Sequence, residues 1–182
     1  MPRPTPSQTV GPFFGYALST PGGGDAAPAG HPDTLTVHGY VRDGKGDPVP
    51  DALVETWQRV PKALPGSLRR DPVTGGSPGR DGVGFTGFGR VATDADGHWV
   101  IRTLAPPATA PYLAIAVFAR GLAHHLHTRA YLDPTASDRL LSALAPERAA
   151  TLVAQEERQG THRFDIHLQG EKETVFLDFH HD

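Results

Sequence analysis

The chain has 182 residues, a formal net charge of −3 and a pI near 6.3. This length suits one domain with a sizeable core, and the charge gives no case for binding to nucleic acid or to an anionic membrane surface. The absence of cysteine excludes disulfides, a thiolate nucleophile and a cysteine-ligated metal. No signal-like apolar run follows Met1 and no apolar stretch reaches membrane-spanning length, so we expect a cytoplasmic protein.

Residues 1–34 are rich in proline and glycine and are predicted to form an N-terminal arm, followed by a single domain over residues 35–182. Residues 5–14 of the arm read Thr-Pro-Ser-Gln-Thr-Val-Gly-Pro-Phe-Phe, and their prolines exclude an ordinary helix or a central strand. Such a segment usually lies extended across a surface. The later run Pro-Gly-Gly-Gly-Asp at residues 21–25 is expected to be a flexible insertion.

Alternating apolar residues and frequent turn signals predict short strands in the rest of the chain. The predicted strands cover residues 35–41, 52–57, 112–118, 126–132, 163–168 and 174–179, with a hairpin formed by residues 88–93 and 98–104. Helices are predicted over residues 146–153, where Pro146 suits the first position, and over residues 137–144. Together these elements predict an antiparallel β-sandwich with one or two short helices.

Two features of the sequence have several interpretations. The loop of residues 59–86 is long enough to be functional, packed on a partner, or disordered. His125 and His127 project from the same face of their predicted strand, which suits two ligands of one metal ion, but a surface strand carrying histidines explains them as well. A self-sufficient metalloenzyme that adds His162 or His167 to this pair therefore stays open as an alternative.

Seven motifs follow one another along the chain. They are Thr-Pro-Ser-Gln-Thr-x-Gly-Pro in the arm, the double strand from Gly39 to Trp57, Phe-Gly-Arg-x-x-Thr (88–93), Phe-Ala-Arg-Gly (118–121), His-Leu-His-Thr-Arg-x-Tyr (125–131), Arg-Phe-Asp-Ile (163–166) and Gln-Gly-Glu-x-Glu-Thr-Val-Phe (169–176). As an ordered set spanning nearly the whole chain, they resemble the intradiol ring-cleaving dioxygenases, and within that family the α subunits. The resemblance implies a mainly β, prealbumin-like sandwich with an extended N-terminal arm.

The same resemblance implies that this chain binds no metal. In the family, a non-haem ferric iron is held by two tyrosinates and two histidines. Residues 111–116, which match the histidine pair, read Pro-Tyr-Leu-Ala-Ile-Ala, and neither the loop between Trp57 and Phe88 nor residues 105–110 contain a tyrosine. The resemblance therefore implies that a partner β subunit ligates Fe(III), in an (αβ)n hetero-oligomer with this chain.

The reaction implied by the resemblance is cleavage of protocatechuate by O₂ between its two hydroxylated carbons, giving 3-carboxy-cis,cis-muconate in the β-ketoadipate pathway. This chain alone is expected to be inactive and to supply no catalytic residue. Its implied substrate-binding residues, in a pocket shared with the β chain, are Thr9, Gly11, Pro12, Phe13 and Arg129. The planar guanidinium of Arg129 suits the substrate carboxylate, with a salt bridge or an exposed edge charge as the alternative role. The alternative to an enzyme is a prealbumin-like binding or scaffold module without catalysis.

Overall fold

The computed structural model describes residues 14–59, 73 and 82–179. The strands are β1 Leu35–Arg42, β2 Leu53–Trp57, β3 Phe88–Ala92, β4 His98–Thr103, β5 Leu113–Phe118, β6 Leu126–Ala130, β7 Gln155–Arg158, β8 Thr161–Arg163 and β9 Ile166–His167. The helices are α1 Phe14–Leu18, α2 Arg139–Ala143 and α3 Pro146–Ala150. None of the helices in these ranges is long and apolar enough to cross a bilayer.

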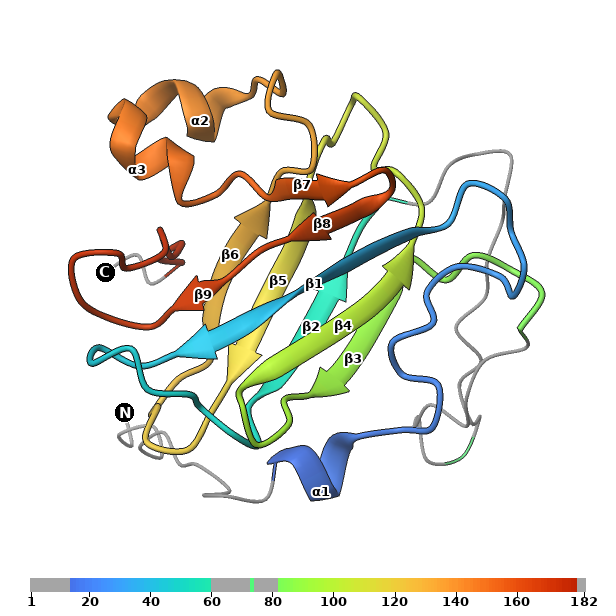
Figure 1. Cartoon of the computed structure of the whole chain (residues 1–182), viewed down its shortest axis with the longest axis horizontal. Helices are drawn as coiled ribbons and strands as arrows, with labels where there is room; N and C mark the ends of the chain where they lie inside the picture. Colours follow the sequence, from blue (N-terminus) through green and yellow to red (C-terminus); the bar gives the residue numbers. More distant parts are fainter. Residues whose placement is uncertain (1–13, 60–72, 74–81, 180–182) are drawn as a thin grey trace, which may run out of the picture.

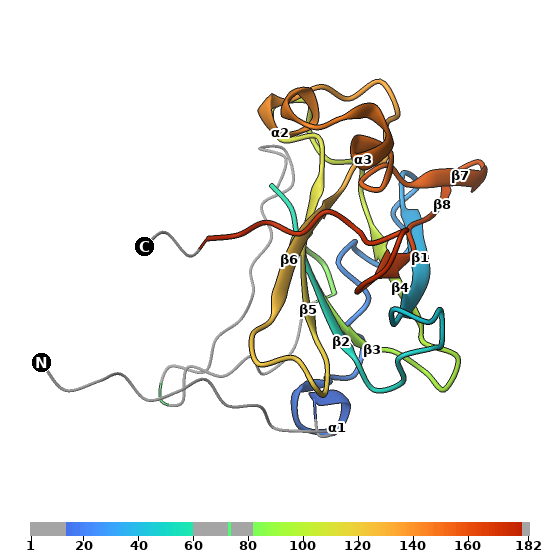
Figure 2. The ribbon, with the colours of Figure 1, turned by 90° about the vertical axis from the view of Figure 1, so that its left-hand side faces the viewer.

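The strands form two sheets that lie face to face, seen from the side in Figure 2. The first sheet has the order β4-β1-β8-β7, with β9 also pairing with β1, and the second has the order β3-β2-β5-β6. All pairs are antiparallel except those that β1 makes with β8 and β9. The predicted β-sandwich is therefore confirmed. Helices α2 and α3 lie together at one end of it (Figure 1).

The core lies between the two sheets because successive side chains of a strand point to opposite faces. In β1, Val37 and Val41 are fully buried and alternate with half-buried residues. In β5, Leu113, Ile115 and Val117 point into the same apolar cluster. A fully buried side chain of this size contributes about 1.5–3 kcal/mol through the hydrophobic effect, so these alternating positions hold the sheets together.

The hairpin predicted between residues 88–93 and 98–104 is wrong, although both strands exist. Strand β3 pairs with β2 in the second sheet, and β4 pairs with β1 in the first. The turn at residues 94–97 thus carries the chain from one sheet to the other. Gly97 has a φ of 77° there, and its carbonyl accepts a hydrogen bond of 2.8 Å from the Val41 amide, which ties the turn to β1.

The run of glycines at residues 22–24 is not a flexible insertion. Arg90 of β3 donates its amide to the Gly23 carbonyl at 2.9 Å, and Arg102 of β4 donates to the Gly24 carbonyl at 2.7 Å. A Cβ at Gly23 would overlap the Arg90 carbonyl oxygen, and one at Gly24 would lie 2.8 Å from the Val100 carbonyl oxygen. Glycine is required because this segment runs backbone to backbone between β3 and β4. The arm boundary at residue 34 stays a prediction.

Other elements differ from the sequence expectation at their ends. Helix α3 stops at Ala150 rather than continuing to residue 153, because the chain turns so that fully buried Leu152 can pack with Tyr131. Residues 174–179 make no strand and only one isolated bridge, between His127 and Leu177. Helix α1 and strand β7 were not anticipated. The predicted helix at 137–144 is confirmed as the shorter α2.

Candidate functional site

Four of the five predicted site residues, Thr9, Gly11, Pro12 and Phe13, lie outside the described residues. The description of the chain begins directly after them, at Phe14 in α1. Helix α1 contacts β2 and β3, and the Phe14 ring lies 5.8 Å from the Phe118 ring of β5. The base of the arm is therefore fixed on the second sheet, at the end where Figure 1 shows α1.

The side of the second sheet that faces away from the core carries the fifth residue, Arg129. In β6, Thr128 and Ala130 are buried, whereas His127 and Arg129 point to the opposite face. The side chain of Arg129 therefore faces away from the core. We call this side of the sheet, which bears the even-numbered residues of β5 and the odd-numbered residues of β6, the outer face.

A row of five rings crosses the outer face. Its members are Phe14, Phe118, His125, His127 and Phe179, with successive centroid separations of 5.8, 5.0, 4.6 and 5.1 Å. The row connects the base of the N-terminal arm to the C-terminal segment, which is held by a 2.7 Å hydrogen bond from the Leu177 amide to the His127 carbonyl. Figure 2 shows the C-terminal segment passing beside β6. Both ends of the described chain thus lie on this face, at opposite ends of the row.

Within the row, His125 and His127 behave as aromatic packing partners. Burial lowers the pKa of His127 below its ordinary value, and the neighbouring His125 lowers it further. A neutral His127 packs against Phe179 without the cost of desolvating a charge. Nowhere in the described ranges do three or more histidine, aspartate or glutamate side chains come together as a metal site.

Arg129 sits in a cluster at the other end of the outer face. Its Nη1 lies 2.9 Å from Asp138 Oδ2 and 3.4 Å from the Tyr131 hydroxyl, and its guanidinium stacks on the Tyr112 ring at 3.9 Å. About a quarter of the side chain, 26%, remains exposed. The predicted salt-bridge alternative is thus present. Of the residues described here, none bonds to Nε or Nη2, which leaves one edge of the fork for another partner.

Asp138 organises this cluster, and the sequence reasoning missed it. Its Oδ1 accepts the Leu141 amide at 2.9 Å and caps α2, while its Oδ2 accepts the Tyr131 hydroxyl at 2.6 Å. Burial acts to raise the pKa of Asp138, but the Tyr131 hydroxyl, the Leu141 amide and Arg129 outweigh it and keep the pKa below its ordinary value. An aspartate placed just before an apolar helical run is an N-cap signal that identifies this residue from sequence.

Tyr131 is the buried member of the cluster. Its ring has no exposed surface, and burial raises the pKa of its phenol to about 12. The phenol therefore stays protonated at neutral pH and acts as a hydrogen-bond donor to Asp138. A tyrosinate ligand, in contrast, requires a deprotonated phenol.

The residues at the family's iron positions do not fit an iron site. Residues 111–116 include Leu113 and Ile115, which are buried to 1% exposure and point into the core between the sheets. Fe(III) is a hard cation that prefers anionic oxygen and imidazole ligands, and neither side chain has a donor atom.

The further ligands considered for the metalloenzyme alternative lie far from His125 and His127. His162 points into the core from β8, and His167 lies in β9, both in the first sheet, whereas His125 and His127 lie on the outer face of the second.

Two curated proteins are similar to this chain over nearly its whole length. The protocatechuate 3,4-dioxygenase alpha chain of Burkholderia cepacia is 37% identical over 97% of this chain and 98% of its own length. That of Pseudomonas putida is 34% identical over 96% of both. No protein-family model matches the chain.

Solved structures of dioxygenases share the fold. The dioxygenase domain of a dioxygenase and carbohydrate-binding protein fusion from Streptomyces sp. SirexAA-E is 26% identical, with a TM-score of 0.55, and the match covers 92% of this chain and 99% of that one. An intradiol ring-cleavage dioxygenase from Tetranychus urticae is 15% identical, also with a TM-score of 0.55, and the match covers 98% and 97%.

Proposed function

This chain belongs to the family of protocatechuate 3,4-dioxygenase alpha chains, and we propose that it is the subunit of such an enzyme that does not bind iron. It pairs with a β subunit, and the complex cleaves protocatechuate with O₂ between the two hydroxylated carbons to give 3-carboxy-cis,cis-muconate. The full-length match to two alpha chains is the observation that carries this proposal. We assign Fe(III) to the partner chain because Leu113 and Ile115 have no donor atoms.

The outer face of the second sheet is the surface that we assign to the β subunit. The row of rings places the base of the arm there, and Phe179 and Trp57 remain 64% and 44% exposed. Large apolar side chains left in water are typical of a surface that another protein covers. Docking of the β subunit on this face brings the arm and Arg129 to the same partner.

The contribution of this chain to the reaction is binding and orientation of the substrate. Part of the pocket wall is formed by Thr9, Gly11, Pro12 and Phe13. Gly11 permits the backbone to approach the substrate closely, and Pro12 keeps that backbone rigid. Arg129 offers the free edge of its guanidinium to the ring carboxylate, while Nη1 stays with Asp138. Fixing the ring in this way lowers the entropic part of the barrier, since a small misplacement of a reactant costs a large factor in rate.

The proposal is tested by iron content and protocatechuate-dependent O₂ uptake, measured on the chain alone and after co-expression with a β chain. We expect neither iron nor activity in the chain alone, and both in the co-purified complex. A complex that lacks residues 1–13 of this chain is expected to keep its iron but to lose activity, which isolates the role of the arm. Stoichiometric iron in the chain alone would contradict the proposal. A complex without activity would favour the alternative, a scaffold module.

A further inference from the structure

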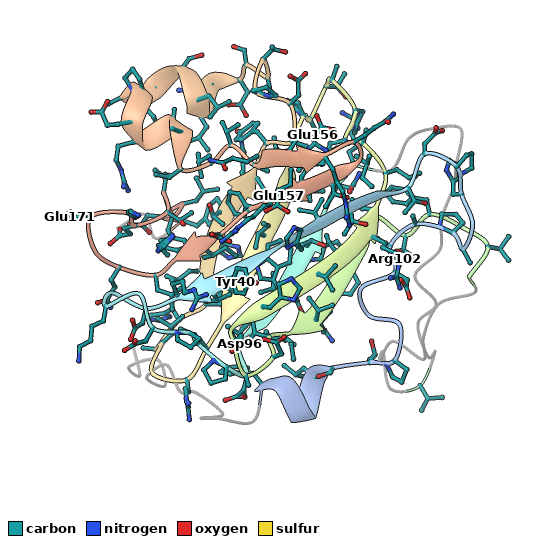
Figure 3. All side chains as sticks on the ribbon, in the orientation of Figure 1. Tyr40, Asp96, Arg102, Glu156, Glu157 and Glu171 are labelled. Atoms are coloured by element: carbon teal, nitrogen blue, oxygen red, sulfur yellow. The ribbon has the colours of Figure 1, made fainter. Side chains whose placement is uncertain are left out.

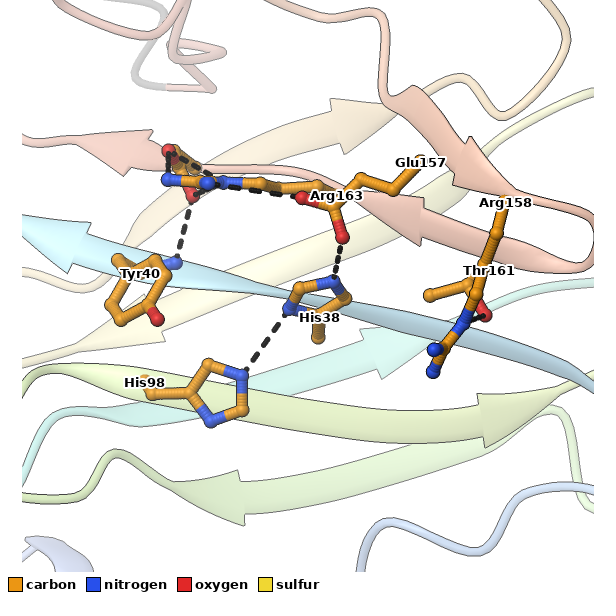
Figure 4. A network of polar contacts seen from close by, with 8 residues as sticks. His38, Tyr40, His98, Glu157, Arg158, Thr161 and Arg163 are labelled. Atoms are coloured by element: carbon orange, nitrogen blue, oxygen red, sulfur yellow. Dashed lines mark hydrogen bonds and ion pairs between the residues drawn. The ribbon is translucent and has the colours of Figure 1, made fainter.

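A second pair of histidines lies on the opposite side of the molecule from the proposed pocket. His38 of β1 and His98 of β4 occupy diagonal positions on the face of the first sheet that points away from the core, because His38 pairs with Val100 and Tyr40 pairs with His98. His98 Nε2 lies 3.3 Å from His38 Nδ1 (Figure 4). The side chain of His38 is 18% exposed and that of His98 is 31% exposed, so small solutes can reach the two nitrogens.

Each imidazole has a carboxylate at its other nitrogen. Glu157 Oε2 lies 3.0 Å from His38 Nε2, so this nitrogen carries the proton and the lone pair stays on Nδ1. Asp94 Oδ2 lies 4.0 Å from His98 Nδ1, at the edge of an ion-pair distance. Figure 3 shows Glu157 and Tyr40 on the side of the first sheet that faces the viewer.

Both carboxylates are held in place by other groups. Asp94 Oδ1 accepts the amides of Asp96 and His98, both at 2.9 Å, which turns Oδ2 toward the His98 ring. Glu157 Oε1 lies 3.7 Å from Arg163, which is itself bound to Asp165 at 2.8 Å. The orientation of both histidines is therefore set by their surroundings.

This geometry matches a pair of metal ligands. A tetrahedral Zn²⁺ with Zn–N bonds of about 2.0–2.1 Å holds two nitrogens about 3.3–3.4 Å apart, which is the separation found here. Histidines that bind metals usually donate their other N–H to a carboxylate, as His38 does to Glu157. We propose that His38 Nδ1 and His98 Nε2 together bind one divalent transition-metal ion of the Zn²⁺ type, with water in the remaining positions.

Binding requires a change of tautomer in His98 and a tilt of both rings, so that their lone pairs converge on the ion. In the metal-free protein, His98 Nε2 carries the proton that points to His38 Nδ1. When the ion takes both lone pairs, that proton moves to His98 Nδ1, where Asp94 Oδ2 accepts it. The negative charges of Asp94 and Glu157 offset the charge of the ion, and Arg163 is already paired with Asp165. This site is independent of the proposed dioxygenase function.

The test is isothermal titration of Zn²⁺ into the full chain, either by itself or in its complex. We expect one saturable site that is lost in both His38→Gln and His98→Gln. Glu157→Gln keeps both ligands but weakens the outer hydrogen bond, and we expect it to lower the affinity by about 10–100-fold. The matched control is the double variant His125→Gln/His127→Gln, which removes the other contacting histidine pair and is expected to bind Zn²⁺ as the parent does.

Three results separate this site from other histidines. Wild-type affinity in His98→Gln would overturn the proposal, as would loss of binding in the His125/His127 control. Because the chain also has His180 and His181, loss of binding in a His180→Gln/His181→Gln variant would assign the ion to those residues instead. Circular dichroism shows whether each variant is folded. If His98→Gln does not fold, electron paramagnetic resonance of bound Cu²⁺ decides, and a spectrum without nitrogen ligands would refute the site.

Discussion

Replacing Asp138 by alanine removes one carboxylate that serves three partners at the end of the outer face. Its Oδ1 caps α2 through the Leu141 amide, and loss of such a cap costs about 1 kcal/mol. Its Oδ2 accepts the hydroxyl of the fully buried Tyr131 at 2.6 Å, and loss of a hydrogen bond to a charged group costs about 1.5–3 kcal/mol. The partly exposed pair with Arg129 adds about 0.2–1 kcal/mol.

We therefore expect Asp138→Ala to lower the free energy of unfolding of the full chain by about 3–5 kcal/mol. Urea unfolding followed by circular dichroism measures it. Asp138→Asn is the matched control, because its single amide oxygen can keep the α2 cap while its NH2 group cannot accept the Tyr131 hydroxyl. Its loss is therefore expected to be smaller than that of the alanine variant by about 1 kcal/mol, the contribution of the cap. A loss below about 1 kcal/mol in the alanine variant would refute the reasoning, since it would mean that the Tyr131 hydroxyl finds water instead.

The pH dependence provides an independent check on Asp138. Its pKa in the folded chain lies below the ordinary value of 3.8, so the native state binds fewer protons than the unfolded state. The stabilisation is complete above pH 3.8 and is lost as the pH falls through the folded pKa. Asp138→Asn is expected to remove this part of the acid sensitivity. If the Asp138→Asn variant lost stability at low pH as the wild type does, the contacts given for Asp138 would be contradicted.

Three further predictions concern single residues. Gly23→Ala is expected to lower the free energy of unfolding by well over the roughly 1 kcal/mol expected for Gly30→Ala. In Gly30→Ala the only cost is the positive φ of the backbone, whereas in Gly23→Ala the new Cβ would overlap the carbonyl oxygen of Arg90. Equal losses in thermal unfolding would contradict this close approach. Burial lowers the pKa of His127, so stability should fall as the pH drops below 6.5, and His127→Gln should flatten that part of the profile in pH-dependent melting. Arg129→Gln in the complex should raise the KM for protocatechuate about tenfold through loss of a charged hydrogen bond. A lower melting temperature with an unchanged KM would mean that Arg129 pairs with Asp138 and does not contact the substrate.

Local chemistry made some features readable in the sequence. The period-two alternation in residues 35–41 and the continuous apolar run in residues 112–118 identify β1 and β5, since both patterns are typical of strands and can be recognised within one short segment. The lack of iron ligands at residues 113–116 can also be recognised from the sequence, because leucine, isoleucine and alanine side chains have no donor atom in any fold. The direction of Arg129 follows from its position in a strand. The order of motifs indicated the family, and the full-length relatives confirm it.

Contacts between distant segments were decided only by the tertiary structure. Strands β3 and β4 look like a hairpin because a turn joins them, but the choice of partner strand depends on β2 and β1. The glycines at residues 22–24 read as a flexible run, yet they are needed for a backbone contact with residues far along the chain. His38 and His98 are 60 residues apart and meet only because β1 pairs with β4. Residue type and spacing describe one segment at a time, whereas a site is a relation between segments that packing brings together.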